Sequence, residues 1–216
     1  VTNINILGDC YRVMANKVGF VTKNVIIATG GLAGGEKLGC DGSMLKILES
    51  AGFDVVEPTP SIVQLRTVND ITKQLKGIKV DAAVTLKTQK NILRQDFGEV
   101  LFTDYGLSGP PIMQISREVP RQKGNTIISL DLMPDTNLDS LCKIIEKRVS
   151  NLPNRPLEEF FTGMFNKRVG QVILKTAGFK LSQKATEIDK TAVRKIAQII
   201  KDMQFAVTGT TGFASA

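Results

Sequence analysis

The sequence contains no histidine and no tryptophan, and only three of its 216 residues are cysteines. Without histidine, the chain cannot by itself form a Ser-His-Asp triad, a zinc protease site of the HExxH type or a histidine-ligated metal centre. Cys10, Cys40 and Cys142 lie too far apart for a CxxC site, and their odd number argues against a disulfide framework. These absences predict no metal site and favour a reduced, cytoplasmic protein.

Long apolar runs and nucleotide-binding glycine motifs are also missing. No run approaches the 18 apolar residues of a membrane helix, and residues 1–9 lack the features of a signal peptide, so we expect no membrane partner. No two of the 19 glycines are separated by one residue, which excludes GxGxxG, and no P-loop motif occurs. The βαβ unit that would bind a pyrophosphate is therefore expected outside this chain.

The charge balance is basic, with a net charge of +7 that could suggest nucleic acid or an anionic membrane. Residues 135–202, however, carry 13 basic and 8 acidic side chains that are interspersed. Such dispersed charge is typical of a solvated helical surface. We therefore expect a small-molecule substrate and no nucleic-acid partner.

A continuous apolar run at residues 25–28 is followed by Thr29, Gly30 and Gly31. The run predicts a strand that is buried on both faces, as in a parallel or mixed α/β sheet. Ligands of open α/β sheets bind where strands end, and glycines there let the backbone approach a cofactor. An ordinary glycine turn after a core strand is the alternative interpretation.

Asp41 and Gly42 precede a predicted helix over residues 43–51, whose apolar residues share one face and which Gly52 ends. Asp41 or Ser43 can cap this helix. The positive end of the helix favours a nearby anionic group such as a pyrophosphate. A purely structural cap is the alternative for Asp41.

The remaining chain changes from strand-like to helical patterning. Residues 1–28 predict a β-meander, and strict alternation over residues 79–87 predicts a half-buried antiparallel strand. Residues 135–204 show the apolar spacing of helices, which is most simply explained by core packing. Further strands, which together predict a small sheet or barrel, are expected at 91–97, 99–103 and 126–131, with a turn at Gly98.

Residues 98–111, GEVLFTDYGLSGPP, predict a strand, a glycine-rich turn and a helix capped by Ser108. This stretch resembles the GELLFTHYGLSGPAIL motif of the BaiN-like flavoproteins, a family of NAD(P)/FAD-dependent oxidoreductases. Asp104 stands where the family motif commonly has histidine. The ATGG sequence at residues 28–31, followed by Asp41-Gly42, resembles the same family.

The resemblance implies a set of site residues. In the family the ATGG sequence ends a strand of the FAD-binding domain and lies against the cofactor. The residues expected to contact FAD are Ala28, Thr29, Gly30, Gly31, Asp41 and Gly42. Residues expected near flavin or substrate, with a structural turn as the alternative, are Gly106, Leu107, Ser108 and Gly109. No catalytic acid or base is assigned.

The expected fold class is mixed α+β, a piece of a dinucleotide-binding domain plus an insert with a barrel-like and a helical part. Because the resemblance covers only the middle of the family's usual length, we expect a central fragment. Its predicted parts are a partial FAD-binding domain at 1–57, a β-rich insert at 58–134, a helical insert at 135–204 and a return strand at 205–216.

The resemblance implies flavin-mediated hydride transfer, with the insert shaping a substrate pocket and NAD(P)H as a candidate partner. The fragment alone is expected to be inactive and to retain no FAD. The alternative hypothesis makes the insert a protein-interaction or oligomerisation module without a catalytic role. The substrate, the electron donor and the oligomeric state do not follow from the sequence.

Overall fold

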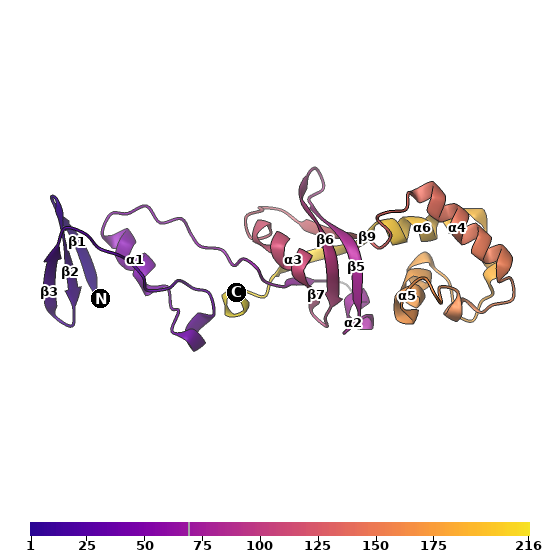
Figure 1. Cartoon of the computed structure of the whole chain (residues 1–216), viewed down its shortest axis with the longest axis horizontal. Helices are drawn as coiled ribbons and strands as arrows, with labels where there is room; N and C mark the ends of the chain where they lie inside the picture. The colour runs from indigo at the N-terminus through magenta and orange to yellow at the C-terminus, as the bar shows by residue number, and fades with distance from the viewer. Residues whose placement is uncertain (69) are drawn as a thin grey trace. The chain divides into compact units, whose positions relative to one another are not determined.

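The computed structural model describes residues 1–68 and 70–216, which form two compact units (Figure 1). The first unit comprises Val1–Pro60 and Gly212–Ala216, and the second comprises Ser61–Thr211. Both units contain strands and helices, so the mixed α+β class is confirmed. None of the helices in the described residues is long and apolar enough to cross a bilayer.

The first unit begins with a three-stranded antiparallel meander. Asn16 and Lys17 connect the second and third strands, and their positive φ angles of 48° and 67° are those of a type I′ hairpin turn. Among the residues of these strands, Ile4 alone is buried, so one face has no apolar cover. The strands are β1 (Asn3–Leu7), β2 (Cys10–Ala15) and β3 (Val18–Thr22).

The predicted buried strand at residues 25–28 is wrong for this chain. The segment has no regular secondary structure and pairs with no described strand. Ile26 is 92% exposed and Ile27 is 45% exposed. A strand needs hydrogen bonds from a neighbouring strand, and the described meander offers none beyond β3. The apolar run therefore predicts that these side chains are buried, but the described residues do not cover them.

Helix α1 (Ser43–Ser50) follows as predicted. Asp41 precedes it, and its Oδ1 accepts a hydrogen bond of 2.9 Å from the backbone N–H of Ser43. Gly52, with φ of 88°, follows the last turn and donates its N–H to the Glu49 carbonyl at 3.0 Å. A left-handed glycine at this place is the usual way to satisfy the carbonyls at a helix end.

The second unit contains a closed six-stranded antiparallel barrel, which confirms the barrel-like part of the fold prediction. The strand order around the barrel is β4-β7-β6-β5-β8-β9. Closure removes the unpaired edges that an open sheet would expose. The strands are β4 (Leu65–Thr67), β5 (Lys79–Lys87), β6 (Ile92–Phe102), β7 (Gly106–Ser108), β8 (Thr126–Asp131) and β9 (Met203–Thr210).

Strand β5 shows the predicted alternation, because Ala82, Val84 and Leu86 are buried whereas Lys79 and Asp81 are exposed. The predicted turn at Gly98, in contrast, is wrong. Strand β6 runs through Gly98, which lies opposite Ala82 and has a φ of 152°. A Cβ at Gly98 would lie 3.4 Å from Pro111 Cδ, so the glycine lets helix α3 (Pro110–Ile115) pack closely.

Two segment boundaries differ from the prediction. The sequence predicts a return strand over residues 205–216, whereas Met203–Thr210 pairs with β8 and β4 and closes the barrel. Only Gly212–Ala216 groups with the first unit. The sequence also predicts that Ser108 caps a helix, whereas Ser108 ends β7 and Gly109 precedes α3 without a side-chain cap.

The helical part of the second unit shares one apolar core with the barrel. Asparagine or aspartate caps each of its three long helices by accepting a backbone N–H. Figure 1 shows these helices grouped at one end of the barrel. The helices are α4 (Leu138–Asn151), α5 (Lys167–Ala177) and α6 (Lys190–Lys201), and the short α2 (Asp70–Gln74) lies between β4 and β5.

Candidate functional site

Four of the predicted cofactor-contacting residues meet at the start of helix α1. Thr29, Gly30, Asp41 and Gly42 line a cavity of about 130 Å³ together with Val1 and the first residues of α1. The two segments are a dozen residues apart in the sequence. The structure therefore brings together the ATGG sequence and Asp41-Gly42, which are two of the sequences that carry the family resemblance.

The backbone around this cavity is held in the left-handed conformation. Gly30 has a φ of 73° and Gly42 a φ of 67°, a region that side chains with a Cβ rarely adopt. A Cβ on Gly42 would also lie 2.5 Å from Leu32 Cδ2. These positions favour glycine and keep the backbone accessible from the cavity.

Asp41 is held by the helix that it precedes. The hydrogen bond from the Ser43 backbone N–H lowers the pKa of the Asp41 carboxyl below its ordinary value. The backbone N–H groups at a helix start also carry partial positive charge, which attracts anions. The cavity thus combines close backbone approach with a helix start whose partial positive charge is opposed by the Asp41 carboxylate.

Ala28 and Gly31 lie beside the cavity residues in sequence but are not among the residues that line it. Ala28 is exposed, and a Cβ added to Gly31 would meet no atom within 4 Å. Their contact with a cofactor stays a prediction.

The glycines of the GLSG stretch have a structural reason to be glycine. A Cβ on Gly106 would lie 2.0 Å from the Leu65 carbonyl oxygen, and one on Gly109 would lie 2.2 Å from the Glu99 carbonyl oxygen. Leu107 is fully buried in the barrel core. The turn therefore serves barrel packing, and a place near flavin or substrate stays a prediction for Gly106, Leu107, Ser108 and Gly109.

Asp104, which stands where the family motif commonly has histidine, forms an ion pair. Its Oδ2 lies 2.7 Å from Lys76 Nζ. Lys76, as hydrogen-bond donor and positive charge, lowers the pKa of Asp104. At neutral pH this position therefore presents a paired carboxylate.

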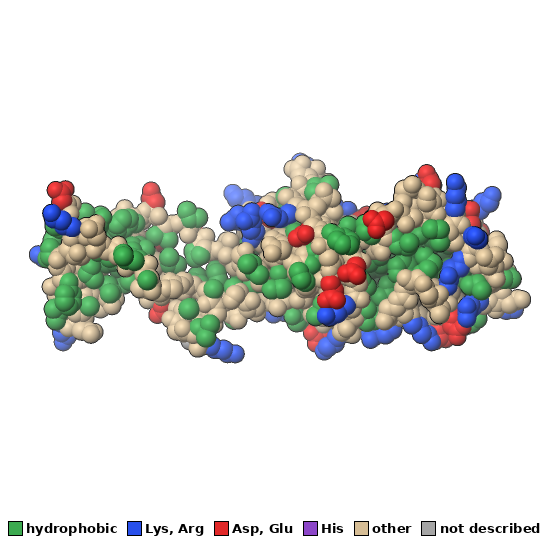
Figure 2. Space-filling model, viewed as in Figure 1, with side chains coloured by type: hydrophobic (Ala, Val, Ile, Leu, Met, Phe, Trp, Pro, Cys, Tyr) green, Lys and Arg blue, Asp and Glu red, His purple; other side chains and the backbone are tan. Residues whose placement is uncertain are grey.

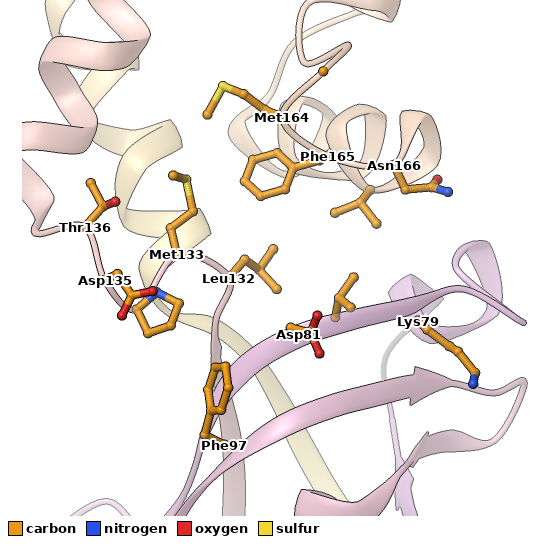
Figure 3. Close-up of a pocket in the computed structure, with 14 residues that line it drawn as sticks. Lys79, Asp81, Phe97, Leu132, Met133, Asp135, Thr136, Met164, Phe165 and Asn166 are labelled. Carbon is orange, nitrogen blue, oxygen red and sulfur yellow. The ribbon is translucent and has the colours of Figure 1, made fainter.

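A larger cleft, of about 620 Å³, was not predicted from the sequence and lies within the second unit between β5, β6 and the helical part (Figure 3). Phe97 on β6 is 60% exposed, and Met133 follows β8. Met164 and Phe165, which precede α5, line the opposite side. The sequence signal that could have indicated this cleft is Phe97, an aromatic residue that faces outward from a barrel strand.

The cleft is acidic at its rim. Asp81 and Asp135 line it, and neither has an ion-pair partner within residues 1–68 and 70–216. Lys79 also lines it, but its Nζ lies 2.8 Å from Glu99 Oε1, which offsets its charge. An apolar cavity with a few polar groups is the usual form of a small-molecule site. This one suits an apolar molecule that donates hydrogen bonds at one edge.

Within the described part of the chain, no group of three or more histidine, cysteine, aspartate or glutamate side chains is arranged to bind a metal ion.

Cys40 lies near the α1 cavity, with its Sγ 3.6 Å from the position of a Cβ on Gly30.

Residues 59–216 match the family described as HI0933-like protein barrel and H2TH domain. The chain belongs to this family. The match confirms the resemblance to BaiN-like oxidoreductases that the sequence motifs indicate, and the family's relatives are flavoproteins.

Known relatives of this HI0933-like chain carry two kinds of name. It is 28% identical over 200 residues to a 3-dehydro-bile acid delta(4,6)-reductase of Clostridium scindens, which covers 91% of this chain and 49% of the relative. It is 25% identical over 208 residues to a ribosomal RNA dihydrouridine synthase of Haemophilus influenzae, which covers 95% of the chain and 49% of the relative. A synthase of the same name from Escherichia coli is 29% identical over 150 residues. That match covers 68% of this chain and 35% of the relative.

The chain thus spans about half the length, or less, of these curated relatives.

Proposed function

We propose that this chain is the central part of an FAD-dependent oxidoreductase that adds hydrogen to a carbon–carbon double bond. The observation that carries the proposal is the meeting of Thr29 and Gly30 with Asp41 and Gly42 around the α1 cavity. The relatives' names support the reaction class, because one is a double-bond reductase and the other makes dihydrouridine, which has two more hydrogens than uridine.

The residues of the α1 cavity fit a polar, hydrogen-bonding part of FAD. Gly30 and Gly42 both have left-handed φ angles that let the backbone approach a ligand, and the start of α1 lies at the cavity. Thr29, which also lines the cavity, carries a hydroxyl that can form a hydrogen bond. When bound, FAD supplies the hydride transfer. The chain's own residues bind and orient it and exclude water.

The second unit is proposed to shape the substrate pocket, with NAD(P)H as electron donor in a cytoplasmic setting. Its cleft supports this role, because it has the size and the mixed apolar and polar lining of a small-molecule site. The chain of 216 residues alone is proposed to be inactive and to lose FAD, because residues 26–31 are exposed around the cavity.

The alternative is that the insert is a protein-interaction or oligomerisation module. That hypothesis depends on helical apolar faces that one core does not need. The structure instead buries Leu141, Ile145, Ile173, Val193 and Ile196 in the core that the helices share with the barrel.

The test of the proposed function is an anaerobic reduction of the full-length protein. Addition of NADH or NADPH is expected to bleach the visible absorption of bound flavin. An RNA that contains uridine, or a steroid with an unsaturated ketone, is then expected to restore it faster than buffer alone. A protein that neither nicotinamide bleaches, or that neither substrate class reoxidises, would contradict the proposal.

A further inference from the structure

The cleft between the barrel and the helical part combines an apolar lining with acidic side chains. Figure 2 shows hydrophobic side chains gathered where these two parts of the second unit meet, with acidic side chains beside them. The lining includes the apolar side chains of Phe97, Met133, Met164 and Phe165. Its volume of about 620 Å³ is that of a site for a small organic molecule.

Contacts outside the cleft hold both of its walls in place. Lys201 Nζ donates hydrogen bonds to the carbonyl oxygens of Met133 and Thr136 at 2.8 and 2.7 Å, which fixes the segment that follows β8. On the opposite side, the ring of Phe165 lies 5.5 Å from the ring of Phe161, which is buried in the core. The cleft is therefore largely preformed, as is usual for a small-molecule site.

Asp81 lies beside Phe97 on the outer face of the barrel. In the pairing of β5 with β6, Asp81 lies opposite Glu99, and Phe97 lies two residues before Glu99. Asp81 and Phe97 are therefore diagonal neighbours on one face of the sheet, a spacing that an aromatic side chain can reach across. Both residues line the cleft (Figure 3). A group bound between them would contact a carboxylate and an aromatic ring together.

The negative charge of Asp81 is not offset by a neighbouring cation. Carboxylates directly opposite each other in a sheet repel, and Lys79 Nζ pairs with Glu99, from which it lies 2.8 Å away. In the part of the chain that the structure describes, Asp81 and Asp135, the two carboxylates of the lining, have no ion-pair partner. The cleft is thus locally acidic in a chain whose net charge is +7.

We propose that this cleft binds an apolar amine in its protonated form. The ammonium group lies between the Asp81 carboxylate and the Phe97 ring, because both a carboxylate and the face of an aromatic ring attract a cation. The hydrocarbon part of the amine lies against Met164 and Phe165 on the opposite wall. Asp135 adds negative charge to the lining and so disfavours an anionic molecule of the same shape.

The inference goes beyond the proposed reduction. It names the class of molecule that the cleft binds, and it holds whether or not that molecule is reduced. A neutral apolar molecule fits the same lining but leaves the Asp81 carboxylate without a cation, so it binds more weakly. The cleft therefore discriminates by charge among molecules of one shape.

The test is a titration of the 216-residue chain with three dansyl probes that differ only at the end of the same alkyl chain. One probe ends in an ammonium group, one in a hydroxyl and one in a carboxylate. Dansyl fluorescence rises in apolar surroundings, and the chain has no tryptophan to interfere with it. The ammonium probe should bind at least about fivefold more tightly than the hydroxyl probe, and the carboxylate probe should bind most weakly.

Two variants locate the bound ammonium group. Asp81→Asn keeps the size of the side chain and removes its charge, so it should lower the preference for the ammonium probe to about twofold or less. The same variant should leave the affinity for the hydroxyl probe within about twofold of that of the unaltered chain. Phe97→Leu should lower the preference about two- to threefold, because an aliphatic side chain offers no aromatic face to a cation.

The matched control is Asp139→Asn on α4. It removes one exposed carboxylate from a position that does not line the cleft, so the preference for the ammonium probe should stay within about twofold of its original value. Thermal unfolding of the chain and of each variant shows that the probes are added to folded protein.

Equal binding of the ammonium and hydroxyl probes would overturn the inference, as would tightest binding of the carboxylate probe. An unchanged preference in Asp81→Asn, an equal loss in Asp139→Asn, or binding of none of the probes to the folded chain would overturn it too. These titrations need neither flavin nor turnover. A failure of the proposed reduction therefore appears in the flavin spectrum alone, and a failure of this inference appears in probe binding alone.

Discussion

Gly106 lies so close to Leu65 that a Cβ on the glycine would stand 2.0 Å from the Leu65 carbonyl oxygen. The φ of Gly106 is 156°, and the contact is where β4 and β7 pair to close the barrel. The barrel can therefore close only because this turn, which carries the family resemblance, has glycine at position 106. Resemblance in this turn supports the fold more directly than it supports a ligand contact.

Substitution of Gly106 by alanine should destabilise the second unit. The added methyl must move the β4 backbone and adopt an unfavourable φ, so we expect a loss of about 3 kcal/mol or more in urea-induced unfolding. Gly124→Ala is the control, because a Cβ there meets no atom within 4 Å and φ is not positive. It should change stability by less than about 0.5 kcal/mol. Equal stability of the two variants would refute the close contact.

The ion pair between Lys76 and Asp104 predicts a pH dependence. Because Lys76 lowers the pKa of Asp104 in the folded state, the stabilisation is present at neutral pH and is lost as the pH falls through that lowered pKa. A carboxyl-carbon NMR titration should give Asp104 a midpoint below that of an ordinary aspartate. Lys76→Met should raise this midpoint, and an unchanged midpoint would show that the pair does not form in solution.

Asp202, between α6 and β9, joins three polar side chains. Burial raises its pKa, but hydrogen bonds from Ser129, Gln204 and Lys87 outweigh that effect and hold the pKa below its ordinary value. Asp202→Ala would leave the buried Ser129 hydroxyl without this acceptor. We expect a loss of about 1–2 kcal/mol in chemical denaturation.

Asp139 provides the comparison for this variant. It lies 3.8 Å from Arg194, and both side chains are largely exposed. Asp139→Ala should cost less than about 0.5 kcal/mol, as is usual for a surface ion pair. If the two alanine variants were equally stable, the Asp202 hydrogen bonds would contribute nothing to the junction.

The elements that the sequence predicted best have a strong local signal. The alternation over β5 predicted a strand because one face meets the core, and the helix at α1 has both its apolar face and Gly52 at its end. The strand at residues 25–28 failed for a different reason. Its apolar composition indicates burial, but strand formation depends on a partner that local sequence does not specify.

Helix α5 and barrel closure show what local patterns leave out. Gly170 interrupts the helical pattern of α5, and its reason is tertiary, since a Cβ there would lie 2.7 Å from Phe161 Cβ. Closure by β9 depends on residues about 140 positions apart, such as Leu65 and Thr210. The cleft likewise requires segments that only the fold brings together. The residues of the α1 cavity were named from the family resemblance, and their contact with a cofactor stays a prediction.

The central claim is that the segment at Thr29 and Gly30 holds flavin against the start of α1. The most direct test is the flavin content of the full-length protein with and without Gly30→Val, with Gly52→Ala, at the far end of α1, as control. The unaltered and control proteins should purify yellow with FAD, and Gly30→Val should fold but carry much less, because a branched side chain is unfavourable at a φ of 73° and fills the cavity wall. A colourless unaltered protein, or a Gly30→Val protein with undiminished FAD, would contradict the account.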